Sequence, residues 1–234
     1  MLAMIDPGDP LAAFPPVDQA LEDPSGLLAI GGDLSTARLL RAYRRGIFPW
    51  YSAGEPILWW SPDPRAVLYP GGLRVTRSLR QSLRNRGYRV TADRAFSPVV
   101  DACAAPRGDQ RGTWITSEMR NAYARLHALG HAHSIETWSE TGELVGGLYG
   151  VMLGRVFFGE SMFARARDAS KVALVKLIER LTPFGLALVD CQVASTHVMS
   201  LGAELVPRAD FTASLEVYAD LPLHDGAWSD EVWT

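Results

Sequence analysis

Cysteine is scarce in this sequence, and long apolar runs are missing from it. Only two of the 234 residues are cysteines, Cys103 and Cys191, and their wide spacing matches neither a disulfide framework nor a zinc site. His131 and His133 flank an alanine without an evident third ligand, so no metal is expected. The longest apolar stretches are far shorter than the roughly 20 residues that cross a bilayer. Because residues 1–16 also lack the pattern of a secretory signal, we expect a cytoplasmic protein with no membrane partner.

Acidic residues are absent from one segment that is rich in arginine. Positions 64–92 hold seven arginines and no acid, although the whole chain has a formal net charge of −3. Charge segregation of this kind indicates either a face that attracts a polyanion or a plain solvated arginine face. Four of these arginines lie on or beside a predicted helix at 76–86, and they are the candidates for phosphate contacts: Arg74, Arg77, Arg80 and Arg84.

The first 64 residues differ from the rest. They hold nine of the fifteen prolines, and their one clear helical pattern covers 35–45, with Ser35 as N-cap and Gly46 as terminator. We therefore expect a small, loop-rich N-terminal domain at 1–64 and a larger domain at 65–234.

From residue 65 onward, strand and helix patterns alternate, which predicts a mixed α+β fold. Strands are expected at 66–69, 134–139, 144–152, 155–158 and 186–193, and helices at 76–86, 117–129 and 170–181, the last capped by Ser170. A hairpin, a helix and a buried strand in this order are typical of the N-acetyltransferase (GNAT-type) fold, in which two strands splay apart around the acyl group. The stretch at 165–171 has no glycine and contains Asp168, so a coenzyme A pyrophosphate loop is not expected there.

Six segments follow one another along nearly the whole chain: GLLAIGGDL at 26–34, GIFPW at 46–50, WWSPDPR at 59–65, GTWIT at 112–116, GESMF at 159–163 and DCQ at 190–192. In this order they resemble the bacterial leucyl/phenylalanyl-tRNA–protein transferases. The resemblance implies transfer of leucine, and also phenylalanine or methionine, from charged tRNA to proteins that begin with arginine or lysine, which marks them for degradation. It also implies the acetyltransferase-like C-terminal domain and no cofactor.

Two tryptophans and a set of apolar residues are candidates for holding the charged tRNA end. Trp50 and Trp114 are either core residues or, as the resemblance implies, the two faces that stack on the terminal adenine. By periodicity alone the apolar set is core, whereas the resemblance makes it the slot for the transferred side chain: Leu148, Met162, Leu174, Leu177, Leu181 and Val189.

Glu160, Asp190 and Gln192 are the candidate catalytic residues. Strand alternation points Asp190 and Gln192 to one side and Cys191 away from the site. A carboxylate in an apolar strand needs a partner, so Asp190 either pairs with an arginine or, with Gln192, orients and polarises the attacking amine. Glu160 is expected to hold the cationic N-terminal residue of the acceptor.

Three other functions compete with aminoacyl transfer. A coenzyme A-dependent N-acyltransferase is disfavoured by the loop at 165–171. A non-catalytic tRNA-binding module would not need Asp190 and Gln192 beside an apolar slot. A thiol hydrolase would need Cys191 and His197, which lie six residues apart across a strand end.

Overall fold

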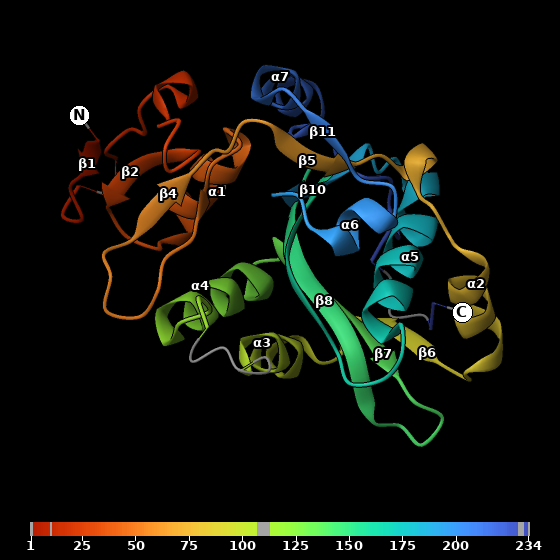
Figure 1. The fold of residues 1–234 in the computed structure, drawn as a ribbon. Coiled ribbons are helices and arrows are strands. Elements are labelled where there is room, and N and C mark those ends of the chain that lie inside the picture. Colours follow the sequence, from red (N-terminus) through yellow and green to blue (C-terminus); the bar gives the residue numbers. More distant parts are fainter. Residues whose placement is uncertain (1, 10, 107–112, 229–231, 234) are drawn as a thin grey trace.

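Two β-sheets divide the strands according to their place in the sequence (Figure 1). The computed structural model describes residues 2–9, 11–106, 113–228 and 232–233. The smaller sheet has the order β1-β2-β4-β3 and contains β1 (Ala3–Ile5), β2 (Leu27–Gly31), β3 (Phe48–Pro49) and β4 (Leu58–Trp60).

The larger sheet is mixed, with both parallel and antiparallel neighbours. Its order is β11-β5-β10-β9-β8-β7-β6, which confirms the predicted mixture of helices with a sheet. Its strands are β5 (Arg65–Leu68), β6 (Arg89–Ala92), β7 (Ala132–Trp138), β8 (Leu144–Leu153), β9 (Val156–Ala164), β10 (Leu188–Gln192) and β11 (Glu204–Val206).

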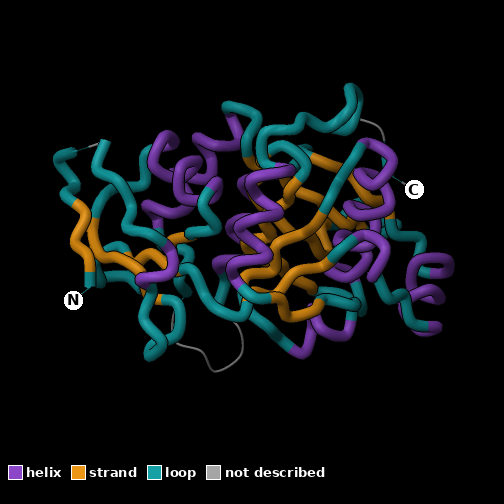
Figure 2. Tube along the Cα trace, turned by 90° about the horizontal axis from the view of Figure 1, so that it is seen from above, coloured by secondary structure: helices purple, strands orange, loops and turns teal. Residues whose placement is uncertain are grey.

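Helices cover both faces of the larger sheet, as Figure 2 shows from above. One face packs against α5, which in turn contacts α2, and the other face packs against α3 and α4. Within the described residues, no helix is long and apolar enough to cross a membrane. The α-helices are α1 (Thr36–Arg44), α2 (Arg77–Asn85), α3 (Phe96–Ala104), α4 (Ser117–Ala128), α5 (Ala169–Leu181), α6 (Thr196–Ser200) and α7 (Arg208–Tyr218), and 3-10 turns occur at Val17–Gln19, Pro70–Gly72 and Thr182–Phe184.

Three helices begin at side-chain caps, of which the one at Ser35 was predicted and is confirmed. Ser35, Thr76 and Thr116 each accept a hydrogen bond from the backbone N–H three residues on, which satisfies a donor that the first turn leaves free. The cap predicted for α5 is wrong. Asp168 occupies the N-cap position in the left-handed region (φ 61°), and its carboxylate accepts from the Ser82 hydroxyl at 2.6 Å instead of capping the helix.

β9 and β10 diverge, and this divergence positions the site. They pair in parallel only from Val156 to Phe158, opposite Leu188 to Asp190. β9 then continues to Ala164 along β8, well beyond the predicted end at residue 158. Along the way Gly159 pairs with Gly150 and Ser161 with Tyr149, so Glu160 is the extra residue of a β-bulge.

The predicted boundary at residue 64 falls between the two sheets but not between two cores. One buried hydrophobic cluster runs across it, with Tyr43 and Trp59 on one side and Tyr149 and Phe158 on the other. Because the two parts share this core, their division into separate domains stays a prediction.

Candidate active site

A cavity of about 920 Å³ opens where β9 and β10 diverge. Four of the six predicted slot residues line it: Leu148, Met162, Leu174 and Val189. Leu177 and Leu181 do not. They lie further along α5 and are fully buried, because the cavity reaches only the first part of that helix, at Ser170 and Leu174.

Asp190 is bound on both carboxylate oxygens by an arginine that the catalytic hypothesis did not include. The Arg65 Nε and Nη2 atoms donate to them at 2.8 and 2.7 Å, and both side chains are almost completely buried. Arg65 also donates to the Gly46 carbonyl at 3.1 Å and lies over the rings of Phe48 and Phe211. The pairing that sequence left open therefore forms, and it leaves Asp190 poorly placed to meet an amine directly.

Gln192 leaves the regular strand path beside this ion pair. Its backbone is left-handed (φ 55°), the register shifts between Asp190 and Gln192, and its N–H donates to Asp190 Oδ1 at 3.0 Å. The side chain lines the cavity, and its Nε2 atom is buried with no hydrogen-bond partner among the described residues. An amide donor in that condition is available to a bound ligand.

Cys191 lines the same cavity, so the prediction that it faces away from the site is wrong. Strand alternation assumes regular extended backbone, which the irregularity at Asp190–Gln192 interrupts. Burial raises the pKa of the Cys191 thiol to about 12. A nucleophilic thiolate is therefore strongly disfavoured, although His197 lines the same cavity.

Glu160 lines the cavity and is clamped by two tyrosines. The Tyr43 hydroxyl of α1 reaches one carboxylate oxygen and the Tyr123 hydroxyl of α4 reaches the other, both at 2.6 Å. The residue as a whole is half-buried, but its carboxyl group is enclosed. This burial raises the pKa of Glu160 to about 7, with the negative charge of Asp190 acting in the same direction and the phenol hydrogen bonds and Arg65 opposing it.

Trp114 lines the cavity and Trp50 does not. Trp50 lies just after β3 with 44% of its surface exposed, and its ring is tilted against Trp60 at a centroid distance of 5.7 Å. Trp50 is therefore not a core residue, whereas Trp59 is fully buried. The first residue of the GTWIT segment, Gly112, lies outside the described residues.

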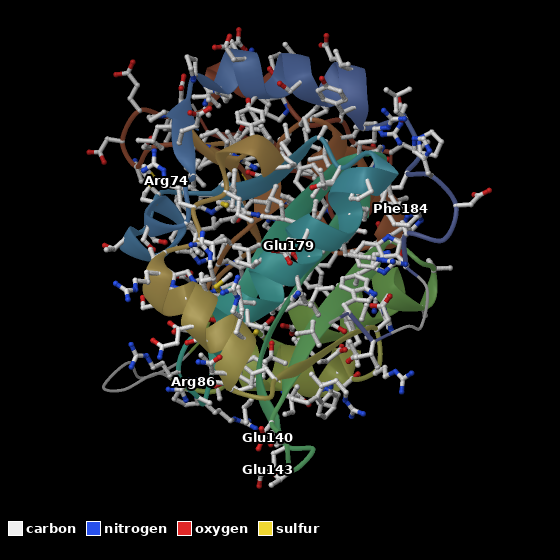
Figure 3. All side chains as sticks on the ribbon, turned by 90° about the vertical axis from the view of Figure 1, so that its right-hand side faces the viewer. Arg74, Arg86, Glu140, Glu143, Glu179 and Phe184 are labelled. Carbon is white, nitrogen blue, oxygen red and sulfur yellow. The ribbon has the colours of Figure 1, made fainter. Side chains whose placement is uncertain are left out.

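The candidate phosphate contacts are exposed along α2. Arg74 precedes the helix, and Arg77, Arg80 and Arg84 project from it. Figure 3 views this side of the molecule, with Arg74 near one end of α2 and Arg86 near the other. No carboxylate among the described residues lies within 4.0 Å of the four candidates.

Sequence reasoning missed Arg65, Tyr43 and Tyr123 as site residues. Arg65 gave one signal, because it directly precedes the apolar strand predicted at 66–69 and Asp190 needed an arginine partner if buried. The tyrosines gave none, because Tyr43 fits an apolar helix stripe.

An apolar cavity between diverging strands, lined also by an amide and a carboxyl group, fits an enzyme that transfers an acyl group. The chain belongs to the leucyl/phenylalanyl-tRNA protein transferase family: the model of that family matches residues 67–216, and the model of its N-terminal domain matches residues 32–63.

Curated relatives carry the same description over nearly their whole length. The leucyl/phenylalanyl-tRNA–protein transferase of Methylococcus capsulatus is 55% identical over 97% of both chains. That of Aromatoleum aromaticum is 60% identical over 93% of this chain and 92% of its own. Among solved structures, L-PGS from Bacillus licheniformis covers 72% of this chain and 54% of its own at 13% identity, but its TM-score of 0.39 is too low to carry an argument.

Proposed function

We propose that this chain moves leucine, and also phenylalanine or methionine, from aminoacyl-tRNA to the N-terminal arginine or lysine of acceptor proteins, in the cytoplasm. Such a transfer marks the acceptor for degradation. Membership of the family supports the reaction, and the apolar slot between β9 and β10 supports an unbranched or aromatic apolar acyl group. Residues 65–234 are proposed to form an acetyltransferase-like (GNAT-type) domain and residues 1–64 a smaller accessory domain.

The transferred side chain is proposed to lie in the slot, with the tRNA end leaving past Trp114. Stacking of the terminal adenine on Trp114 would contribute roughly 1–3 kcal/mol, and the exposed ring of Trp50 is the proposed second face. The exposed arginines of α2 are proposed to contact acceptor-stem phosphates irrespective of sequence.

The chemistry joins an amine to an ester that is already activated. The amine nitrogen attacks the carbonyl carbon, the bond to the ribose oxygen breaks, and an amide and a free hydroxyl result. Gln192 cannot titrate, so its unpartnered side-chain N–H is proposed to donate to the ester carbonyl oxygen as negative charge develops there. Asp190 supports this amide by accepting the Gln192 backbone N–H, and Arg65 holds Asp190 in place.

Glu160 is proposed to attract the basic N-terminus of the acceptor. Of the two carboxylates among the described residues that line the cavity, Asp190 is neutralised by Arg65 and Glu160 is not. An unneutralised carboxylate favours a cationic ligand over an acidic one.

A transfer assay tests this proposal. Radiolabelled leucyl-tRNA is offered with matched peptides that begin with Arg, Lys, Asp or Ala, and label is expected on the first two. Coenzyme A esters serve as the competing donors. A coenzyme A-dependent N-acyltransferase is disfavoured because Asp168 places a carboxylate at the start of α5, where a pyrophosphate would bind. Acylation by those esters without transfer from leucyl-tRNA would overturn the proposal.

A further inference from the structure

Tyr43, Tyr123 and Glu160 form a closed triangle of oxygen atoms. Each hydroxyl lies 2.6 Å from one oxygen of the Glu160 carboxyl group, and the two hydroxyls lie 2.5 Å from each other. Both tyrosines are fully buried. The three side chains come from α1, α4 and the bulge of β9, so distant parts of the chain hold one group.

Proton counting shows that this triangle is one proton short when Glu160 is ionised. Three hydrogen bonds need three protons, and the two phenols supply only two. When Glu160 is protonated, the carboxyl O–H donates to one phenol, that phenol donates to the other, and the second phenol donates back to the carboxyl group. All three contacts are then satisfied. The geometry therefore favours the uptake of one proton.

We propose that Glu160 takes the proton that the attacking amine loses, and that Tyr43 and Tyr123 are the positioning residues that complete the triangle with it. This inference depends on the proposed function. As the amine nitrogen bonds to the carbonyl carbon, its proton passes to Glu160. As the bond from carbon to the ribose oxygen breaks, the proton passes from Glu160 to that oxygen. The step balances without another reactant.

The groups around the triangle of oxygen atoms suit this role. Arg65 of β5 and Asp190 of β10 neutralise each other, and Tyr149 of β8 packs edge-on against Tyr123. Burial raises the pKa of Glu160 to about 7. A group with that pKa both accepts and returns a proton near neutral pH.

Glu160→Gln is the matched variant for the test. The N–H of a glutamine amide supplies the third hydrogen-bond donor that the triangle needs, so the variant imitates protonated Glu160 but cannot accept a proton. We expect a folded protein whose kcat at saturating acceptor is at least about 100-fold below wild type. In wild type, kcat should rise with pH through about 7, whereas the variant should keep only the later rise that comes from deprotonation of the acceptor amine, whose pKa is about 7.7–8.0 in a free peptide. An effect on acceptor attraction alone would appear in KM.

Tyr43→Phe and Tyr123→Phe test the clamp. Each is expected to lower kcat about 10-fold with little change in KM, and the double variant should lose less than the product of the two, because each single change already opens the triangle. Tyr88→Phe, which removes a hydroxyl bonded to the Arg167 carbonyl, is the control and should match wild type.

The outcomes separate the two proposals. If wild type transfers leucine but Glu160→Gln keeps its kcat and the same rise with pH, the proton acceptor is another group and this inference fails. If wild type transfers nothing from aminoacyl-tRNA, the proposed function itself fails.

Discussion

Replacing Asp190 separates a supporting role from a catalytic one. Asp190→Ala removes the partner of Arg65 and leaves a buried, uncompensated guanidinium group that also contacts Gly46, Phe48 and Phe211. Removing one partner of a buried ion pair destabilises a protein by about 3–5 kcal/mol. Urea unfolding at constant pH should show a loss of this size, and transfer should fall with it, so activity alone cannot assign the role of Asp190.

Asp190→Asn gives the sharper comparison. Asparagine keeps an acceptor oxygen for the Gln192 N–H and for one Arg65 nitrogen, but it cannot act as a base. If Asp190 only supports Gln192, the Asn variant should be destabilised less than the Ala variant and should keep kcat within about 10-fold of wild type.

Two results would refute this reasoning. A stable, well-folded Asp190→Asn variant whose kcat falls about 1,000-fold would show that the carboxylate takes part in the chemistry. Unchanged unfolding of Asp190→Ala would show that the ion pair contributes nothing to stability. Arg65→Met combined with Asp190→Leu is a further control. It should recover stability relative to Asp190→Ala but not activity, because Gln192 loses the acceptor of its N–H.

Three other predictions concern charge and stacking. Burial raises the pKa of Glu160 from its ordinary value of 4.5 to about 7, so the folded state loses stability as pH rises between these values. In urea unfolding, Glu160→Gln should therefore be more stable than wild type by roughly 3 kcal/mol at pH 8, with little difference at pH 4. Equal differences at both pH values would contradict this. Trp114→Ala should raise the KM for leucyl-tRNA by about 5- to 150-fold if an adenine stacks on it, and an unchanged KM would leave it a wall of the cavity. Because its half-buried ring also packs against the core, KM is compared at a temperature where the variant is fully folded. Replacing Arg77, Arg80 and Arg84 with glutamine should make tRNA binding less sensitive to salt. The slope of log K against log salt concentration should become shallower by about 0.7–0.9 for each phosphate that the variant no longer neutralises. An unchanged slope would show that these arginines form a solvated face without phosphate contacts.

Local features of the fold could be predicted because their causes are local. The caps at Ser35, Thr76 and Thr116 act within three residues, so the starts of α1, α2 and α4 follow from short sequence signals. The start of α5 could not be predicted in this way, because Asp168 is held by Ser82 from α2, more than 80 residues earlier.

The site was only partly predictable for the same reason. Periodicity places Leu174 and Leu177 on the same side of α5, but it cannot tell which of them a cavity reaches. Alternation cannot foresee the left-handed backbone at Gln192, which brings Cys191 into the lining. The phenol clamp depends on hydrogen bonds across 37 and 117 residues, which no single segment encodes.

The ion pair and the clamp both draw on residues before position 50. Gly46 and Phe48 support Arg65, and Tyr43 holds Glu160. A gene cut at residue 64 would therefore yield a larger fragment with both polar centres incomplete. Supplying the first 64 residues as a separate peptide should restore transfer only when the two fragments associate. Chimeras between relatives should work best when the GIFPW segment and its partners are inherited from the same parent.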